Sequence, residues 1–377
     1  MSGVAIPYSR PHRSGREATL VAQALAGDHW RGDGPFTAQA SALVSAAVGG
    51  GKVLLTTSCT HALEMSALLL GVGPGDEVIV PSFTFVSTAS AFALRGARIV
   101  FADVDPRTLG LDPAEVARKA SPRTRAVVVV HYAGVAADVD AIAAAAPGAA
   151  VVEDNAHGLF ASWRGRPLGS LGQLATQSFH DTKNLGCGEG GALVINDRAL
   201  DERAEIIREK GTNRARFFRG QVDKYTWVDL GSSYLPSDLL AAVLVAQLEA
   251  APAIQAARHQ VWRRYHAELA GWAAHHGVQQ PHVPVGAEHA AHIYWLRVAT
   301  LATRQRMIAH LAAAGIQATF HYQPLHLSEV GRKAGGRDGD CPVSEQVADT
   351  LVRLPLYADL GDADVERVIA AVTAFGA

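Results

Sequence analysis

The sequence predicts an α/β fold in which helices cover both faces of a mostly parallel sheet. Short runs of β-branched residues alternate with stretches of helical pattern in the first half of the chain. Most of these runs are apolar on both faces, which is typical of parallel strands buried between helices. The expected strands are residues 77–81, 97–101, 126–131, 149–153, 177–179 and 192–196, and the expected helices are residues 61–70, 86–95, 113–120 and 139–146.

The pattern changes after Ile195, which predicts a second, smaller α/β domain. A charged helix is expected first, and then a stretch rich in Arg, Phe and polar residues. The later elements that we expect are helices at 198–210, 237–250, 304–314 and 362–375 and short strands at 292–298 and 316–322. Helix 237–250 would face the core with Leu239, Leu240, Val243, Leu244 and Leu248. We assign residues 1–248 to a large domain, whose N-terminal segment is free to pack elsewhere, and residues 249–377 to a small C-terminal domain.

Composition and charge exclude several classes of protein. The chain has 377 residues, enough for two domains, and its 49% apolar and 19% charged residues are ordinary for a globular protein. A net charge of -2 creates no field that favours nucleic acid or membrane. The three cysteines, Cys59, Cys187 and Cys341, lack metal-ligand spacing and indicate a reducing compartment. Because no signal peptide or run of about 20 apolar residues is evident, we expect a cytoplasmic protein without a bound metal.

Lys183 is the lysine best placed for chemistry. Of the six lysines, only Lys183 lies between an expected strand, 175–179, and a glycine-rich run, 186–191, that leads to another strand. A lysine at such a place can project into a cleft and form an imine with a carbonyl. Upstream, Asp154 follows an apolar strand. Pyridoxal 5′-phosphate (PLP) needs both groups, because the acid keeps its ring nitrogen protonated and the lysine holds its aldehyde.

Each residue also has a plainer interpretation. An isolated lysine is usually a solvated surface charge, and an Asp after a strand often caps the next helix. A phosphate site favours the functional interpretation: residues 54–64 open a helix, and hydroxyls and free N–H groups at a helix start bind phosphate. Phe85 follows the next strand and would stack on a cofactor ring or belong to the core. Thr60, Phe85, Asp154 and Lys183 all follow strand ends, where open α/β sheets bind ligands.

The chain resembles the DegT/DnrJ/EryC1/StrS family of sugar aminotransferases of fold type I, over nearly its whole length. Within that family it is similar to the branch that aminates dTDP-4-keto-6-deoxyglucose in common-antigen and natural-product sugar pathways. The resemblance rests on residues 58–60, 75–82, 130–135, 178–184, 188–191, 208–214 and 218–227, of which the last two segments are long and distinctive. A variant of the family with His in place of the lysine performs dehydration, so Lys183 favours transamination.

The resemblance implies a role for each site residue. Lys183 would hold PLP as an imine, Asp154 would pair with the ring nitrogen, His157 would contact the ring hydroxyl, and Phe85 would stack on the ring. The phosphate would lie against Thr60, the His61 backbone and Ser178. In many relatives an Asn of the partner subunit reaches the phosphate, and here Ser232 or Ser233 would take its place in an active site shared by a homodimer. The expected substrate contacts are His180, Lys210, Arg214, Arg219, Lys224 and Tyr322, although the four basic ones also suit a solvated surface.

The reaction that the resemblance implies moves an amino group from L-glutamate to C4 of a dTDP-4-keto-6-deoxy-hexose. An alternative is an aminotransferase that acts at C3 of a nucleotide sugar, and a further one is a non-catalytic sensor that binds nucleotide sugars. A nicotinamide-linked dehydrogenase is disfavoured, because the glycines of residues 71–75 follow a helix rather than a strand and lack the third spaced glycine. The sequence leaves open whether the product has the gluco or the galacto configuration.

Overall fold

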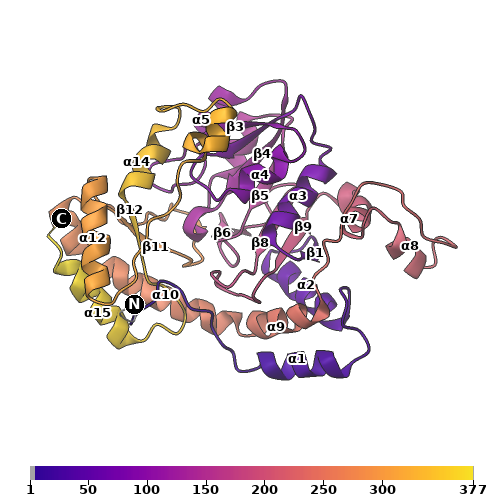
Figure 1. Cartoon of the computed structure of the whole chain (residues 1–377), viewed down its shortest axis with the longest axis horizontal. Coiled ribbons are helices and arrows are strands. Elements are labelled where there is room, and N and C mark those ends of the chain that lie inside the picture. Colours follow the sequence, from indigo (N-terminus) through magenta and orange to yellow (C-terminus); the bar gives the residue numbers. More distant parts are fainter. Residues whose placement is uncertain (1–4, 377) are drawn as a thin grey trace.

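The computed structural model describes residues 5–376 and is built around a seven-stranded sheet (Figure 1). The strand order across the sheet is β1-β9-β8-β5-β4-β2-β3. Strand β9 pairs antiparallel with β1 and with β8, and the other neighbouring strands run parallel. This confirms the mostly parallel sheet. The strands are β1 (Lys52–Thr56), β2 (Glu77–Pro81), β3 (Arg98–Ala102), β4 (Thr124–Val130), β5 (Ala150–Asp154), β8 (Leu174–Ser178) and β9 (Gly191–Ile195).

Helices cover both faces of the sheet because successive residues of a strand point to opposite sides. Val78 packs in a layer with α3, α4 and α7, while the adjacent Ile79 packs with α5 and α6. In β9, Leu193 joins the first layer, and Val194 packs with α1, α2 and α9. These helices are α1 (Glu17–Ala26), α2 (Pro35–Ala47), α3 (Cys59–Leu69), α4 (Ser87–Ala93), α5 (Pro113–Lys119), α6 (Val139–Ala145), α7 (Asp201–Arg208) and α9 (Asp238–Glu249).

The predicted strands and helices of this domain are present, with ends shifted by a few residues. Strand β1 and helices α1 and α2 were not predicted. Strand β1 begins directly after Gly49, Gly50 and Gly51, which all have positive φ. Because these glycines are typical of a loop, the short apolar run that follows them does not stand out as a strand in the sequence. The predicted helix at 198–210 is a 3-10 turn, Arg198–Leu200, followed by α7, and it ends at Arg208.

The predicted core face of α9 was right for Leu244 and Leu248, which are buried, and wrong for Leu239, Leu240 and Val243. Its buried residues include Ala241, Ala242, Val245 and Ala246, whereas Leu239 and Leu240 are only half-buried. The small side chains allow α9 to lie close to α1 and α2, and all three helices contribute to one core cluster. The buried face of α9 is therefore centred on small residues, with Leu244 and Leu248 beside them.

The small domain has its own core around a two-stranded antiparallel sheet, which Figure 1 shows beside the C-terminus. Ile6 belongs to this core, so the N-terminal segment packs on the small domain. The predicted short strand at 316–322 was wrong, because only isolated bridges form there, at Ile316 and Thr319. The elements are α10 (Ala251–Glu268), α11 (Ala270–His276), β11 (Tyr294–Arg297), α12 (Leu301–Ala313), α13 (Glu329–Lys333), α14 (Pro342–Thr350), β12 (Leu351–Leu354) and α15 (Asp362–Thr373). The boundary at residue 248 stays a prediction.

The remaining elements are short. They are β6 (Ser162–Trp163), β7 (Arg166–Pro167), β10 (Ala287–Glu288), α8 (Arg214–Phe218) and the 3-10 turns Tyr132–Gly134 and Leu325–Leu327. Within residues 5–376 no single helix is long and apolar enough to cross a membrane, although α9 and α10 pass that test together across a bend of 60°. The described part of the chain also has no group of three or more His, Cys, Asp or Glu residues placed to hold a metal ion.

Candidate active site

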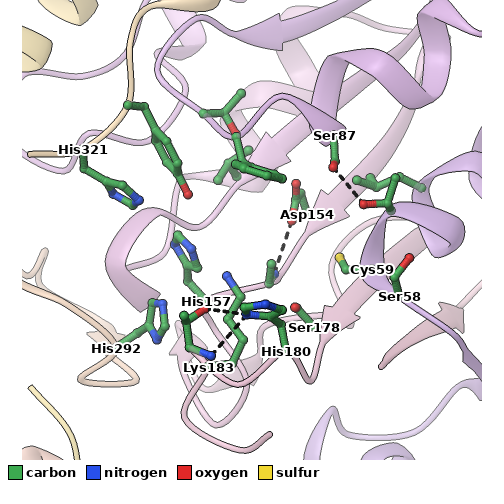
Figure 2. Close-up of a pocket in the computed structure, with 18 of the residues that line it drawn as sticks. Ser58, Cys59, Ser87, Asp154, His157, Ser178, His180, Lys183, His292 and His321 are labelled. Carbon is green, nitrogen blue, oxygen red and sulfur yellow. Dashed lines mark hydrogen bonds between the residues drawn. The ribbon is translucent and has the colours of Figure 1, made fainter. Parts of the chain in front are cut away.

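A cavity of about 570 Å³ lies at the carboxyl ends of β5 and β8. It brings together most of the residues that the sequence predicted, and Figure 2 shows Asp154, His157, Ser178, His180 and Lys183 around it. The predicted residues among its lining are Thr60, Phe85, Asp154, His157, Ser178, His180, Lys183 and Tyr322. Residues from distant parts of the sequence therefore converge on one space.

Asp154 is the last residue of β5 and is buried. Its Oδ2 accepts a hydrogen bond of 2.7 Å from the Thr88 hydroxyl, which also lies 2.9 Å from the Thr84 hydroxyl. Burial raises the pKa of Asp154 above its ordinary value, and the hydrogen bond from Thr88 and the charge of Lys183 offset only part of this effect. A cation beside this carboxylate would therefore be strongly favoured.

Lys183 lies in the loop between β8 and β9, where its backbone N–H donates to the His180 carbonyl at 2.8 Å. Burial lowers the pKa of its amine to about 8, although the nearby Cys59 thiol and the Asp154 carboxylate act in the opposite direction. Near neutral pH the amine therefore exists in both protonation states. Such a lysine can serve as a nucleophile and as a base.

His157 forms the wall of the cavity beside Lys183. Its ring stacks on that of His292, with the centroids 4.3 Å apart. Its Nδ1 is buried and has no hydrogen-bond partner among residues 5–376. Burial, and secondarily the charge of Lys183, lower the pKa of His157 well below its usual value, so the imidazole is neutral. A neutral ring with an unpartnered nitrogen is suited to a hydroxyl of a bound molecule.

A set of hydroxyls and backbone N–H groups lies at the start of α3. The Ser58 side chain caps the helix by accepting from the His61 N–H, and the Thr60 hydroxyl lies 2.8 Å from that of Ser87. Ser178 ends β8 nearby and also lines the cavity. A helix N-terminus flanked by the hydroxyls of Thr60, Ser87 and Ser178 is suited to an anionic phosphate.

The structure distinguishes between the two interpretations of Phe85, stacking on a cofactor ring or packing in the core, and the nearby Phe83 provides the comparison. Phe83 is fully buried in the core, whereas Phe85 is 56% exposed and lines the cavity. The ring of Phe85 lies 6.3 Å from that of Tyr322. A large exposed aromatic at a cavity is suited to stack on a ligand ring, so Phe85 is not a core residue.

Several predicted residues lie outside this cavity in the same chain. His61 uses its N–H in the helix cap, and its ring packs edge-on against Tyr234. Lys224 is exposed and lines neither this cavity nor the second one. A second cavity, of about 760 Å³, is lined by Lys210, Arg214, Arg219 and Ser233 among others. Arg214 and Arg219 form ion pairs there with Glu209 and Glu205. Contacts of these residues with substrate or phosphate stay predictions, which require a second subunit.

Sequence reasoning missed several residues that line or support the cavity, and five of them carry polar groups of interest. Thr88 and Ser87 lie in the first turn of α4. They could have been predicted from the sequence, because they are hydroxyl residues that follow closely after the end of strand β2. His292, His321 and Arg353 come from the small domain. The sequence around these three residues does not indicate that they line the site, because only tertiary packing brings them to the large-domain sheet.

The residues around the cavity fit PLP, the cofactor that the resemblance implies. The unpartnered Nδ1 of His157 would contact the ring hydroxyl, and the Asp154 carboxylate would pair with the ring nitrogen. Phe85 would cover the ring, and the start of α3 with Ser87 and Ser178 would hold the phosphate. Lys183 supplies the amine that binds the aldehyde. Each functional group of PLP therefore has a partner of suitable chemistry.

Comparison with known proteins gives the family. Residues 11–373 match the DegT/DnrJ/EryC1/StrS aminotransferase family. The chain is 34% identical over 97% of its length to the spore coat polysaccharide biosynthesis protein SpsC of Bacillus subtilis (strain 168), of which it covers 96%. The aminotransferase TlmJ from Streptoalloteichus hindustanus has a TM-score of 0.89 and 36% identity, with 98% of each chain covered.

A PLP form of Spr1654 from Streptococcus pneumoniae, described as a sugar aminotransferase, has a TM-score of 0.89 and 27% identity, with 98% of this chain and 97% of that chain covered. The fold is that of fold type I PLP enzymes, in agreement with the mostly parallel sheet. The match to the family spans nearly the whole chain, and the cavity contains the groups that PLP requires. The chain therefore belongs to the DegT/DnrJ/EryC1/StrS aminotransferase family, and its cofactor is PLP.

Proposed function

We propose that this chain transfers an amino group from L-glutamate to C4 of a dTDP-4-keto-6-deoxy-hexose, which gives a dTDP-4-amino-4,6-dideoxy sugar. The observation that carries the proposal is that the Lys183 amine and the Asp154 carboxylate line one cavity, since transamination with PLP needs both groups. A sugar acceptor is supported by the relatives, because SpsC is named for polysaccharide biosynthesis and Spr1654 is described as a sugar aminotransferase.

The residues of the cavity have separable tasks in this reaction. Bound PLP supplies the aldehyde that carries the amino group and the ring that accepts electrons. Asp154 would keep the ring nitrogen of bound PLP protonated. Lys183 would take the proton from the α-carbon of the donor and would later deliver a proton to C4 of the acceptor sugar. A pKa of about 8 suits the amine to both transfers near neutral pH.

Three imidazoles, those of His157, His292 and His321, line the cavity together with the Arg353 guanidinium. Burial is the main cause that lowers the pKa values of His157, His292 and His321 well below their usual range, so all three imidazoles are neutral. His321 stacks on Tyr322, with the ring centroids 3.6 Å apart. Neutral donors and acceptors on aromatic surfaces suit sugar hydroxyls. His180 and Tyr322 are the residues that we expect to contact the sugar.

We extend the proposal to a homodimer with a shared active site. The segment 220–234 has large apolar side chains in solvent, with Tyr225 53%, Trp227 72% and Leu230 53% exposed. An exposed apolar segment of this kind is typical of an interface. Figure 1 shows the neighbouring α8 at one edge of the chain, away from the small domain. In the dimer, Lys210, Arg214, Arg219 and Lys224 of one subunit would contact the substrate diphosphate in the partner cavity.

The dimer is tested by mixing two inactive variants, Lys183→Ala and a double variant, Tyr225→Ser with Trp227→Ser. If subunits exchange and the active site is shared, the mixture regains part of the wild-type activity, because one site per heterodimer has both intact parts. Unmixed variants treated in the same way are the control. A fully active monomer by light scattering would contradict the shared site.

The reaction itself is tested by incubating the PLP-loaded protein with L-glutamate and dTDP-4-keto-6-deoxyglucose, followed by NMR of the product. We expect an amino group at C4, and the coupling constants of its proton then give the gluco or galacto configuration. Turnover only with a 3-keto nucleotide sugar would favour the alternative regiochemistry. Binding without turnover of either ketone would favour a sensor.

A further inference from the structure

His292 is a buried histidine of the cavity whose backbone follows a strained turn. The side chain lines the cavity, although the residue as a whole is only 5% exposed. The preceding Ala291 has a φ of 48°, in the left-handed region that residues other than glycine rarely adopt. The buried Arg258 of α10 holds this turn, because its guanidinium donates to the Ala291 carbonyl at 3.1 Å and to the His292 carbonyl at 2.8 Å. Backbone strain of this kind is concentrated at functional sites, where it aims a side chain.

Hydrogen bonds determine which ring nitrogen of His292 carries the proton. The side-chain nitrogen of Asn184 donates to the Ala290 carbonyl at 2.7 Å and to Gln255 Oε1 at 2.8 Å, so both of its protons are used. Asn184 Oδ1 lies 2.8 Å from His292 Nδ1 and can only accept, so Nδ1 is the nitrogen that donates. Because the imidazole is neutral, its Nε2 has a free lone pair. Within residues 5–376 the bond to Asn184 is the only hydrogen bond of this ring.

The His292 ring and the Lys183 amine belong to the same part of the cavity. Lys183 precedes Asn184 in the chain, and Figure 2 shows His292 beside His157 on the side of the cavity away from Ser87. After burial and the neighbouring His157, the charge of Lys183 is the next cause of the lowered pKa of His292. The Lys183 amine itself has no hydrogen-bond partner within residues 5–376. The other charged or titratable groups that act on the amine or on the ring are Cys59, Asp154, Arg258 and Arg353.

We propose that His292 positions the Lys183 amine for proton transfer by accepting a hydrogen bond from it on Nε2. A neutral amine has two N–H groups and one lone pair. One N–H donated to His292 restricts the rotation of the long side chain, so that the lone pair can be directed at the α-carbon of the donor. The opposite tautomer of His292 would present an N–H that competes for this lone pair, so Asn184 sets the useful one. The inference rests on the proposed role of Lys183 as the base, and His292 acts through Lys183.

A titration of Lys183 in the full chain, before PLP or substrate is added, tests the contact itself. The protein is labelled with carbon-13 at the lysine ε-carbons, and the Lys183 signal is identified by NMR as the one lost in Lys183→Arg. An ammonium donates a stronger hydrogen bond than a neutral amine, so the contact favours the charged form. We expect His292→Phe, whose ring can still stack on His157, to lower the pKa of Lys183 by about one unit or more.

Two further variants show whether the lost acceptor causes this shift. His292→Gln keeps an acceptor and should recover part of it. His266→Phe is the matched control, because His266 is a half-buried histidine of α10 that stacks on Trp262 and does not line the cavity. We expect the control to leave the pKa of Lys183 unchanged. An unchanged pKa in His292→Phe, or a shift that His292→Gln does not reduce, would overturn the inference.

The tautomer of His292 is measured directly and needs no substrate. Nitrogen-15 NMR of the histidine-labelled protein distinguishes a protonated ring nitrogen from one with a free lone pair, and the His292 signals are those lost in His292→Phe. We expect the proton on Nδ1 in the wild type. Asn184→Ala removes the acceptor that fixes it, so we expect a mixture of tautomers and a smaller fall in the pKa of Lys183. A wild-type His292 with its proton on Nε2 would overturn the inference whatever the variants show.

The donor half-reaction shows what the contact does for proton transfer. PLP-loaded protein is mixed with L-glutamate in a stopped-flow spectrometer, and the loss of the cofactor's visible absorbance gives a maximal rate and an apparent Kd. We expect His292→Phe to lower the maximal rate about 10- to 100-fold at an unchanged apparent Kd. The midpoint of its pH profile should move to lower pH, because an amine with a lower pKa becomes neutral at lower pH.

The same kinetics separate this inference from the proposed function. A raised apparent Kd for glutamate or for the keto sugar in His292→Phe, at a normal maximal rate and an unmoved pH profile, would mean that His292 binds substrate, and the inference would fail. If the wild type reacts with glutamate but with no keto sugar, the proposed acceptor is wrong while the role of His292 stands.

Discussion

Glu153 and Asp154 are adjacent in β5, yet their carboxylates have opposite surroundings. Glu153 accepts four hydrogen bonds of 2.7 to 2.9 Å, from His131 and from the N–H groups of Gly169, Leu171 and Gly172. Asp154 accepts one short bond, from Thr88, and a longer one of 3.3 Å from the Ala156 N–H. Neighbouring side chains of a strand point to opposite faces. The Glu153 carboxylate therefore lies in the protein interior, and the Asp154 carboxylate lies at the cavity.

The two pKa shifts express the same difference. Burial alone would raise the pKa of Glu153, but its hydrogen bonds, first that of His131, outweigh burial and hold the pKa below its usual value. Burial raises the pKa of Asp154, because its bonds are too few to compensate. A buried carboxylate with so few hydrogen bonds is suited to pair with a cation, here the protonated ring nitrogen of PLP. A fully satisfied one indicates a structural role.

The largest effect is expected from Asp154→Asn. The amide cannot hold a proton on the ring nitrogen, so we expect both half-reactions to slow by about a hundredfold to ten-thousandfold. PLP should still bind, through Lys183 and the phosphate site at Thr60 and Ser178. Stopped-flow kinetics of each half-reaction, with bound cofactor quantified by absorbance, checks this. Wild-type rates with cofactor bound would mean that Asp154 is structural, like its neighbour.

Glu153→Gln should show the reverse pattern. The His131 Nδ1 accepts the Ala137 N–H at 3.2 Å, so its Nε2 carries the proton donated to Glu153. Replacing the buried carboxylate leaves N–H donors poorly satisfied, and we expect a loss of about 3 kcal/mol in the free energy of unfolding. The folded fraction should keep near-normal kcat. Chemical denaturation of the PLP-free protein measures this, and a large loss of kcat without a loss of stability would reverse the assignment.

The pH dependence of the free energy of unfolding should also differ between wild type and Glu153→Gln. The pKa of Glu153 is lowered in the folded protein, so its contribution to stability is present above its ordinary pKa, 4.5, and is lost as the pH falls through the lower folded value. We expect this acid-dependent part of the stability to disappear in Glu153→Gln. Denaturation curves between neutral and acidic pH, compared with wild type, measure it, and an unchanged slope in the variant would contradict it.

A smaller effect is expected from the pH dependence of the donor half-reaction. The Lys183 amine must be neutral to accept the proton, and its pKa is lowered to about 8. The rate should therefore rise by about tenfold per pH unit below that value and level off above it. Single-turnover rates across this range, with glutamate saturating, test the sign. A rate that falls with rising pH, or that still rises steeply well above pH 8, would exclude Lys183 as the base in its present surroundings.

The site residues of the large domain could be predicted from their local sequence. Asp154 and Lys183 each stand at a strand end that the apolar runs reveal, and Thr60 stands at a helix start, so their meeting at one sheet edge follows from parallel topology. Arg353 and His292 come from elements whose patterns predict only a second domain, and Tyr8 comes from the N-terminal segment, where the sequence predicts no helix or strand. Their approach depends on how that domain packs on the first. The α9 core face was predicted only in part for the same reason, because close helix packing of Ala241 and Ala242 is a property of the tertiary structure.

Lys183 is the residue that we expect to carry PLP, and one measurement tests this expectation directly. Borohydride treatment of the PLP-loaded protein fixes the cofactor to whichever of the six lysines holds it, and mass spectrometry of the digested chain then locates the label. We expect the label on Lys183 in wild type, and loss of label together with at least about a thousandfold loss of rate in Lys183→Ala. Label on Lys52, Lys119, Lys210, Lys224 or Lys333, or normal turnover by Lys183→Ala, would contradict the account.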